Sequence, residues 1–144
     1  GREGTRTRAA EAGLEVAASQ AELFERSDVL SLHLRLNADT RGIVSAEDLA
    51  RMKPTALLVN TSRAPLIAPG ALETALREGR PGRAAVDVFD EEPVANHPLL
   101  ALPNFLATPH LGYVEKDSYE LYFGDAFDNL LAFDAGRPVK NLAE

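Results

Sequence analysis

Short apolar runs alternate along this chain with segments that carry helix-start signals, and this alternation limits the folds open to it. The predicted strands are residues 14–17, 28–32, 56–60, 83–88 and 104–107. The predicted helices are residues 5–12, 19–26, a short helix from Ser45 that ends before Pro54, 69–78 and a long amphipathic helix over 116–135. Strands separated by helices predict an α/β fold, a Rossmann-like parallel sheet with helices on both faces, ending in a long helix.

Side-chain signals define where the shorter helices begin. Ser19 and Ser45 are predicted N-caps, and each has an acid three residues further on, Glu22 and Asp48, as in a capping box. Gly79 is a predicted stop for the helix before it. These signals support the proposed helix boundaries independently of the apolar periodicity.

Composition excludes several classes of function. The chain has 144 residues and a net charge of −7, which argues against nucleic acid or an anionic membrane as a partner. It has no cysteine, so it can form neither a disulfide framework nor a thiolate metal site, and no metal site is predicted. Because 45% of its residues are hydrophobic and 26% are charged, we expect a globular, cytoplasmic protein.

Three polar residues stand where predicted strands give way to loops. Arg63 follows the run 56–60, Glu92 follows 83–88, and His110 follows 104–107. Open α/β sheets bind ligands beyond the carboxyl ends of their strands, so these ends can surround one small anion with a cation, a carboxylate and an imidazole. That combination is suited to redox chemistry on an acid.

The segments that carry these residues read LVNTSR at 58–63, DVFDEEP at 87–93 and TPHLG at 108–112. Together, in this order, they resemble the D-isomer-specific 2-hydroxyacid dehydrogenases, the family of phosphoglycerate dehydrogenase and the glyoxylate and hydroxypyruvate reductases. The resemblance implies an NAD(P)-dependent oxidoreductase that transfers a hydride between nicotinamide and a D-2-hydroxy acid or 2-oxo acid.

The resemblance also implies roles for the three residues. Arg63 binds the carboxylate of the acid through its planar fork of donors. His110 is the general acid and base at the substrate oxygen. Glu92 holds the imidazole in one tautomer and favours its protonated form.

Six further residues correspond to positions that contact the cofactor in the family: His33, Leu34, Thr61, Ser62, Asp87 and Gly112. His33, at a strand end, is also typical of a structural histidine. NAD is the expected cofactor, with NADP as the alternative, because Arg2 and Arg6 would suit a 2′-phosphate.

The glycine pattern G-x-G-x-x-G, which places the pyrophosphate at a helix N-terminus, does not occur in the sequence. We therefore expect residues 1–113 to be the C-terminal portion of a dinucleotide-binding domain whose first βαβ half is missing. Residues 114–144 are then a long helix and tail that pack on a missing substrate domain. The expected partners are a small 2-oxo or 2-hydroxy acid, the missing N-terminal portion of the same polypeptide and a second copy in a homodimer.

Two other functions compete with the enzyme. A non-catalytic, corepressor-like module related to the family is supported by the missing glycine pattern and by Ala64, which replaces the glycine that usually follows the catalytic arginine. A hydrolase that uses Ser62, His110 and Asp87 is disfavoured because no G-x-S-x-G sequence surrounds Ser62.

Overall fold

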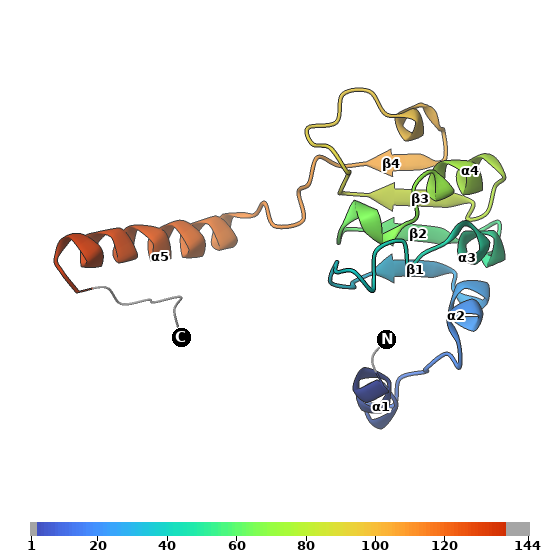
Figure 1. The fold of residues 1–144 in the computed structure, drawn as a ribbon, viewed down its shortest axis with the longest axis horizontal. Helices are drawn as coiled ribbons and strands as arrows, with labels where there is room; N and C mark the ends of the chain where they lie inside the picture. Colours follow the sequence, from blue (N-terminus) through green and yellow to red (C-terminus); the bar gives the residue numbers. More distant parts are fainter. Residues whose placement is uncertain (1–2, 138–144) are drawn as a thin grey trace. The chain divides into compact units, whose positions relative to one another are not determined.

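A four-stranded parallel sheet organises the first of two units, Gly1–His110 and Leu111–Glu144, into which contacts divide the chain. The computed structural model describes residues 3–137. The strands are β1 (Val29–Leu32), β2 (Leu57–Asn60), β3 (Arg83–Val86) and β4 (Phe105–Ala107), in the spatial order β1-β2-β3-β4 (Figure 1). All three pairings are parallel, which confirms the predicted α/β class.

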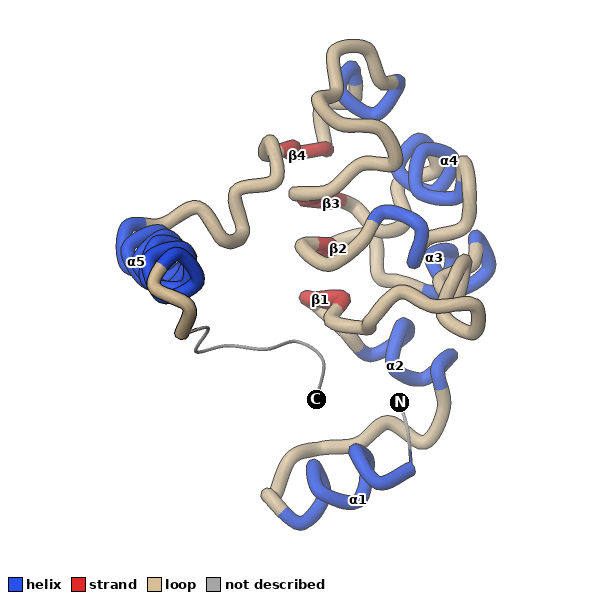
Figure 2. Tube along the Cα trace, turned by 60° about the vertical axis from the view of Figure 1, so that its left-hand side comes forward, coloured by secondary structure: helices blue, strands red, loops and turns tan. Residues whose placement is uncertain are grey.

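Short helices connect the strands. In chain order they are α1 (Glu3–Glu11), α2 (Gln20–Arg26), α3 (Ala46–Arg51), the 3-10 helix η1 (Ala64–Leu66), α4 (Ala71–Arg77) and the 3-10 helix η2 (Pro98–Ala101). The helices α2, α3 and α4 lie together on one side of the sheet (Figure 2). On the other face of the sheet Val29 and Leu106 remain 63% and 62% exposed. Helices are expected on both faces of the sheet, and within this unit they cover one face.

The core lies between the sheet and these helices. Along β1, β2 and β3 every second side chain is buried, as expected for strands with one covered face. Leu58 of β2 packs in one cluster with Leu49 of α3 and Leu76 of α4. Burying a side chain of this size contributes about 1.5–3 kcal/mol. The buried face therefore fixes the register of the strands, because a slip by one residue would expose it.

The two predicted capping boxes differ in the structure. Ser45 accepts from the Asp48 N–H while Asp48 accepts from the Ser45 N–H, which confirms the second box. Ser19 likewise accepts from the Glu22 N–H, but the Glu22 carboxylate accepts from the Ala18 N–H at 2.6 Å rather than from Ser19. Ser19 and Ser45 therefore both cap their helices as predicted. The predicted hydrogen bond from the Ser19 N–H to Glu22 is wrong.

The predicted strand at residues 14–17 is wrong, because this segment is irregular. Within the described residues this segment does not pair with β1, the strand at that edge of the sheet. Instead, the Arg6 guanidinium donates to the carbonyl oxygens of Ala17 and Ala18 at 2.9 and 3.2 Å. Leu14 is left 64% exposed.

The second unit contains one long helix, α5 (Lys116–Asp134), close to the predicted bounds. Its N-cap, Glu115, accepts from the backbone N–H groups of Asp117 and Ser118. None of its side chains is buried. The exposed apolar ones follow a helical spacing and include Tyr119, Tyr122, Phe123, Phe127, Leu130 and Phe133. Among residues 3–137, no helix has the length and apolar character needed to span a membrane.

Gly82, directly before β3, offers a test of this packing. A Cβ atom there would overlap the Pro54 carbonyl oxygen, so we expect Gly82→Ala to lower the free energy of unfolding by about 1–3 kcal/mol. Urea denaturation followed by circular dichroism measures the change. Gly4→Ala, where a Cβ meets no atom within 4 Å, is the control and should cost nothing. Equal stability of the two variants would contradict the packing.

Candidate functional site

The ends of three neighbouring strands define the site. Asn60, Val86 and Ala107 are aligned across β2, β3 and β4 by the pairing register. Neighbouring strands are about 4.8 Å apart. The loops that carry Arg63, Glu92 and His110 therefore leave the sheet side by side at its carboxyl edge, as predicted from the sequence.

Glu92 and His110 are in direct contact. Oε2 of Glu92 lies 2.7 Å from Nδ1 of His110, and both side chains are about one third exposed. Because a carboxylate can only accept, Nδ1 carries a proton and donates it to Glu92. The imidazole is thereby held in one tautomer with Nε2 as its other nitrogen.

A second hydrogen bond anchors Glu92. Its Oε1 atom accepts from the backbone N–H of Phe89 at 2.8 Å, so the two carboxylate oxygens have different partners. The Phe89 N–H and, second, the His110 side chain lower the pKa of Glu92 from its ordinary value of 4.5, while partial desolvation and then the nearby Asp87 charge oppose this shift. Glu92 is therefore ionised at neutral pH.

The backbone of His110 is left-handed, with φ of 55°. Among residues 3–137 it is the one residue other than glycine with positive φ. This conformation costs roughly 1–2 kcal/mol for a side-chain-bearing residue and is concentrated at functional sites. The bend turns the chain as it leaves β4, directly at the residue whose ring meets Glu92.

Arg63 lies three residues beyond β2 in extended backbone, with φ of −147° and ψ of 136°. Its side chain is exposed, and its Nη1 donates to the carbonyl of Ser62 at 2.6 Å. Among the hydrogen bonds of the described residues, the guanidinium has none with Glu92 or His110. The structure thus pairs two of the three predicted catalytic residues and places the third on an adjacent strand end.

Asp87 is buried at the end of β3, with 4% of its surface exposed. Its Oδ1 accepts from the Thr108 hydroxyl at 2.5 Å, and its backbone N–H donates to the Asn60 carbonyl. A buried carboxyl at this edge, oriented by Thr108, can accept from an amide group of a ligand.

The other predicted cofactor residues are distributed over two loops and the second unit. The Ser62 hydroxyl donates to the Leu34 carbonyl at 2.8 Å, which joins the loop after β1 to the loop after β2. His33 forms a hydrogen bond to Ser31 at 2.9 Å, and Thr61 is exposed. Gly112 belongs to the second unit, and Arg2 lies outside the described residues.

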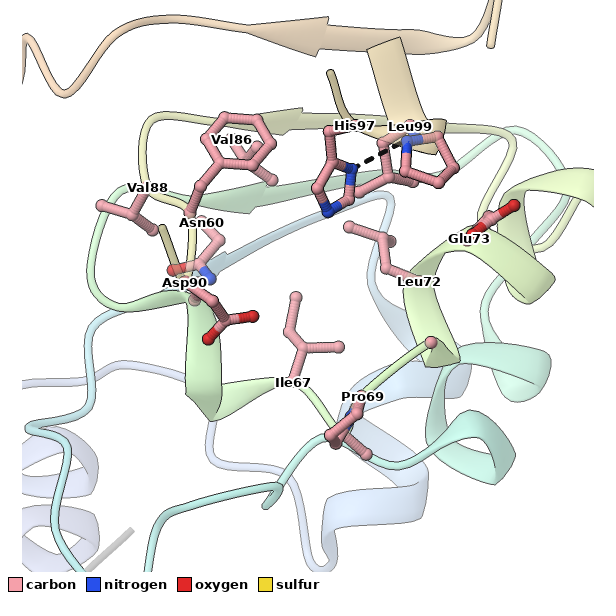
Figure 3. A pocket seen from close by; sticks show the side chains of 15 residues that line it. Asn60, Ile67, Pro69, Leu72, Glu73, Val86, Val88, Asp90, His97 and Leu99 are labelled. Atoms are coloured by element: carbon pink, nitrogen blue, oxygen red, sulfur yellow. Dashed lines mark hydrogen bonds between the residues drawn. The ribbon is translucent and has the colours of Figure 1, made fainter. Parts of the chain in front are cut away.

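A cavity of about 190 Å³ lies at the end of β2, lined by η1, α4 and the segment that follows β3 (Figure 3). Its walls are mainly apolar, with Asn60, Asp90 and His97 among the polar residues. Nδ1 of His97 accepts from the Leu99 N–H at 3.2 Å and so caps η2. The described residues contain no group of three potential ligands that could hold a metal ion.

Three residues without a predicted role also shape the site: Asn60, Phe89 and Thr108. Phe89 acts through its backbone, which no residue type reveals. Asn60 stands two residues before Ser62 at a strand end, and this is the spacing at which asparagine side chains bond their own loop. That signal was available in the sequence.

Ala64 is the first residue of η1 and has no positive φ. The left-handed conformation that would require glycine is therefore not used at this position. Replacement of the family's usual glycine is compatible with the backbone of this loop.

Comparison with known proteins gives matches along most of the chain. The family model described as "D-isomer specific 2-hydroxyacid dehydrogenase, NAD binding domain" matches residues 2–112. A glyoxylate reductase of Aeropyrum pernix is 42% identical over 125 residues, which cover 86% of this chain and 37% of that protein. The crystal structure of a phosphoglycerate oxidoreductase from Vibrio cholerae has a TM-score of 0.88 and 54% identity, and the match covers 94% of this chain and 44% of that one. The chain spans about two fifths of the length of the curated relatives it matches.

The two anchors of Glu92 predict how it titrates. Its folded-state pKa lies below 4.5, so the stability it contributes is complete above the unfolded pKa and is lost as pH falls through the lower folded value. We expect the carboxyl ¹³C resonance of Glu92 to titrate below pH 4.5. In His110→Ala the midpoint should rise, because one of the two side-chain and backbone hydrogen bonds that lower this pKa is lost. An unchanged midpoint in that variant would contradict the contact with His110.

Proposed function

The chain belongs to the D-isomer-specific 2-hydroxyacid dehydrogenase family, and we propose that it supplies the catalytic residues of an NAD-dependent oxidoreductase that interconverts D-2-hydroxy acids and 2-oxo acids. The domain that its family model describes binds NAD. Because the chain spans about two fifths of its relatives, the activity proposed is that of a longer polypeptide. The single observation that carries the proposal is the 2.7 Å pair of His110 and Glu92 at the strand edge that also bears Arg63.

His110 is the proposed general acid and base. Its Nδ1–H is held by the ionised Glu92, and Nε2 is the proposed atom that exchanges a proton with the substrate oxygen. In reduction, Nε2–H gives its proton to the carbonyl oxygen of the 2-oxo acid. In oxidation, neutral Nε2 takes the proton from the hydroxyl. Glu92 orients the imidazole ring for this exchange through the 2.7 Å contact at Nδ1.

Arg63 is the proposed anchor for the carboxylate of the acid. A guanidinium offers two parallel N–H donors to a carboxylate, and it keeps its charge at every accessible pH. Since the chain carries a net charge of −7, anion binding at this edge depends on such a local cation. The exposed side chain of Arg63 is available for this role because its present hydrogen bond is to a backbone carbonyl.

The residues at the strand ends suit the nicotinamide end of a dinucleotide. The buried Asp87 offers an acceptor for a carboxamide, and the joined loops of Ser62 and Leu34 offer backbone groups beside it. When bound, the cofactor supplies or accepts the hydride. Arg6 already donates to the carbonyls of Ala17 and Ala18, which supports NAD over NADP in this proposal.

The partners of the chain follow from the same proposal. A longer polypeptide would supply the pyrophosphate turn and a substrate domain, and the apolar side chains exposed on α5 support contact with a further domain and a second copy in a homodimer. We further propose a cytoplasmic location, which the lack of cysteine in the sequence suits.

We predict that the 144-residue chain alone does not turn over substrate. It lacks the glycine pattern that holds the pyrophosphate, and orienting both reactants supplies much of an enzymatic rate. The measurement is NADH oxidation in the presence of glyoxylate or hydroxypyruvate, monitored at 340 nm. Steady turnover that scales with the concentration of the isolated chain would contradict the prediction.

In the longer polypeptide, His110→Ala should lower kcat about 10²- to 10⁴-fold with cofactor binding retained, since it removes the proton-transfer group. Arg63→Ala should instead raise KM for the 2-oxo acid about 10- to 100-fold, since it removes charge-assisted hydrogen bonds. Steady-state kinetics and a fluorescence titration with NADH measure both.

Two variants serve as matched controls. Arg77→Ala removes an arginine that pairs with Glu73 on α4, and His97→Asn keeps a capping side chain at η2. Both should retain wild-type kinetics. If His110→Ala keeps its kcat, the proton-transfer role is wrong. If the intact protein binds NADH but reduces no 2-oxo acid, the non-catalytic module becomes the better function.

A further inference from the structure

Asn60 stands out as a buried amide in an apolar row. Only 1% of its surface is exposed. It is the last residue of β2, and its partners in register on either side are Leu32 and Val86, both buried and apolar. Burying an amide here is unfavourable unless every polar atom is bonded, whereas an apolar side chain would suit the core without any such requirement.

The hydrogen bonds of the Asn60 side chain go to the loop that carries Arg63. Its Oδ1 accepts from the Ser62 N–H at 3.0 Å, and its Nδ2 donates to the Arg63 carbonyl at 3.0 Å. These two backbone groups stand at the two ends of the segment Ser62–Arg63. One rigid, planar amide therefore fixes both ends of that segment.

The sheet holds Asn60 itself in place. Its carbonyl accepts from the Asp87 N–H at 3.0 Å, which ties it to the end of β3. The loop has one further attachment, from the Ser62 hydroxyl to the Leu34 carbonyl. The direction in which Arg63 leaves the backbone is thus set by the sheet through Asn60, because the guanidinium itself bonds only the neighbouring Ser62 carbonyl.

We infer that Asn60 is a positioning residue for substrate binding, which holds the Ser62–Arg63 backbone so that the Arg63 guanidinium faces the carboxylate of the 2-oxo acid. The inference rests on the proposed function of Arg63. It goes beyond that function in assigning the geometry of the anion site to a buried side chain that touches no reactant.

The test is a double-mutant cycle in the longer polypeptide, with KM for glyoxylate or hydroxypyruvate as the readout. Asn60→Ala removes both hydrogen bonds, while Asn60→Asp keeps the size and the acceptor but loses the donor to Arg63. We expect each variant to raise KM about 10-fold with Arg63 present. In the Arg63→Ala background the same changes should have no further effect on KM, because there is no guanidinium left to position.

Asn104 provides a matched control for a purely structural amide. Its Nδ2 donates to the carbonyls of Leu76 and Gly82 at 3.0 and 3.1 Å, away from the Arg63 loop. Asn104→Asp should lower the melting temperature and leave KM unchanged. If Asn104→Asp and Asn60→Asp raise KM equally, the effect is one of general stability and the inference is overturned.

The cycle separates failure of the inference from failure of the proposed function. If Arg63→Ala leaves KM unchanged, Arg63 does not bind the substrate, and both are overturned. If Arg63→Ala raises KM but the Asn60 variants do not, or raise it additively in the Arg63→Ala background, only the inference is overturned. Asn60→Asp keeps the test available if Asn60→Ala fails to fold.

Discussion

Parallel pairing in register is the constraint on which the candidate site depends. Because Asn60, Val86 and Ala107 are aligned, three loops far apart in the sequence leave the sheet at one edge. The register is in turn held by the buried face of the strands, where residues such as Leu58 pack against α3 and α4. The geometry of the site therefore depends on the packing of the core.

Hydrogen bonds to backbone groups hold several of the polar side chains at the strand edge. The Phe89 N–H anchors Glu92, and the ends of the Ser62–Arg63 segment are fixed by Asn60. His110 adopts a left-handed backbone, a strain of about 1–2 kcal/mol that the contact with Glu92 helps to offset. Such backbone contacts determine how the polar side chains of the site are oriented.

Local signals in the sequence were read correctly where the structure that they describe is itself local. Ser45 and Asp48 form the expected capping box because all the atoms involved lie within one helical turn. The apolar residues of Leu14–Ala17 predict a strand, but the segment is irregular and does not pair with the edge strand β1, because apolar composition alone does not specify which strand a segment pairs with. Glu22 bonds Ala18 instead of Ser19, a difference of one residue that depends on how the chain enters the helix.

The sequence alone determined the class of fold and the identity of the three polar residues at the strand ends, because periodicity and turn residues are properties of short segments. Only the tertiary structure decided which of them meet: it pairs Glu92 with His110 and leaves Arg63 on the next strand end. Glu92 and His110 lie on loops that follow different strands, so their contact depends on the strand register and on the direction of each loop. No single segment of the sequence encodes either of these.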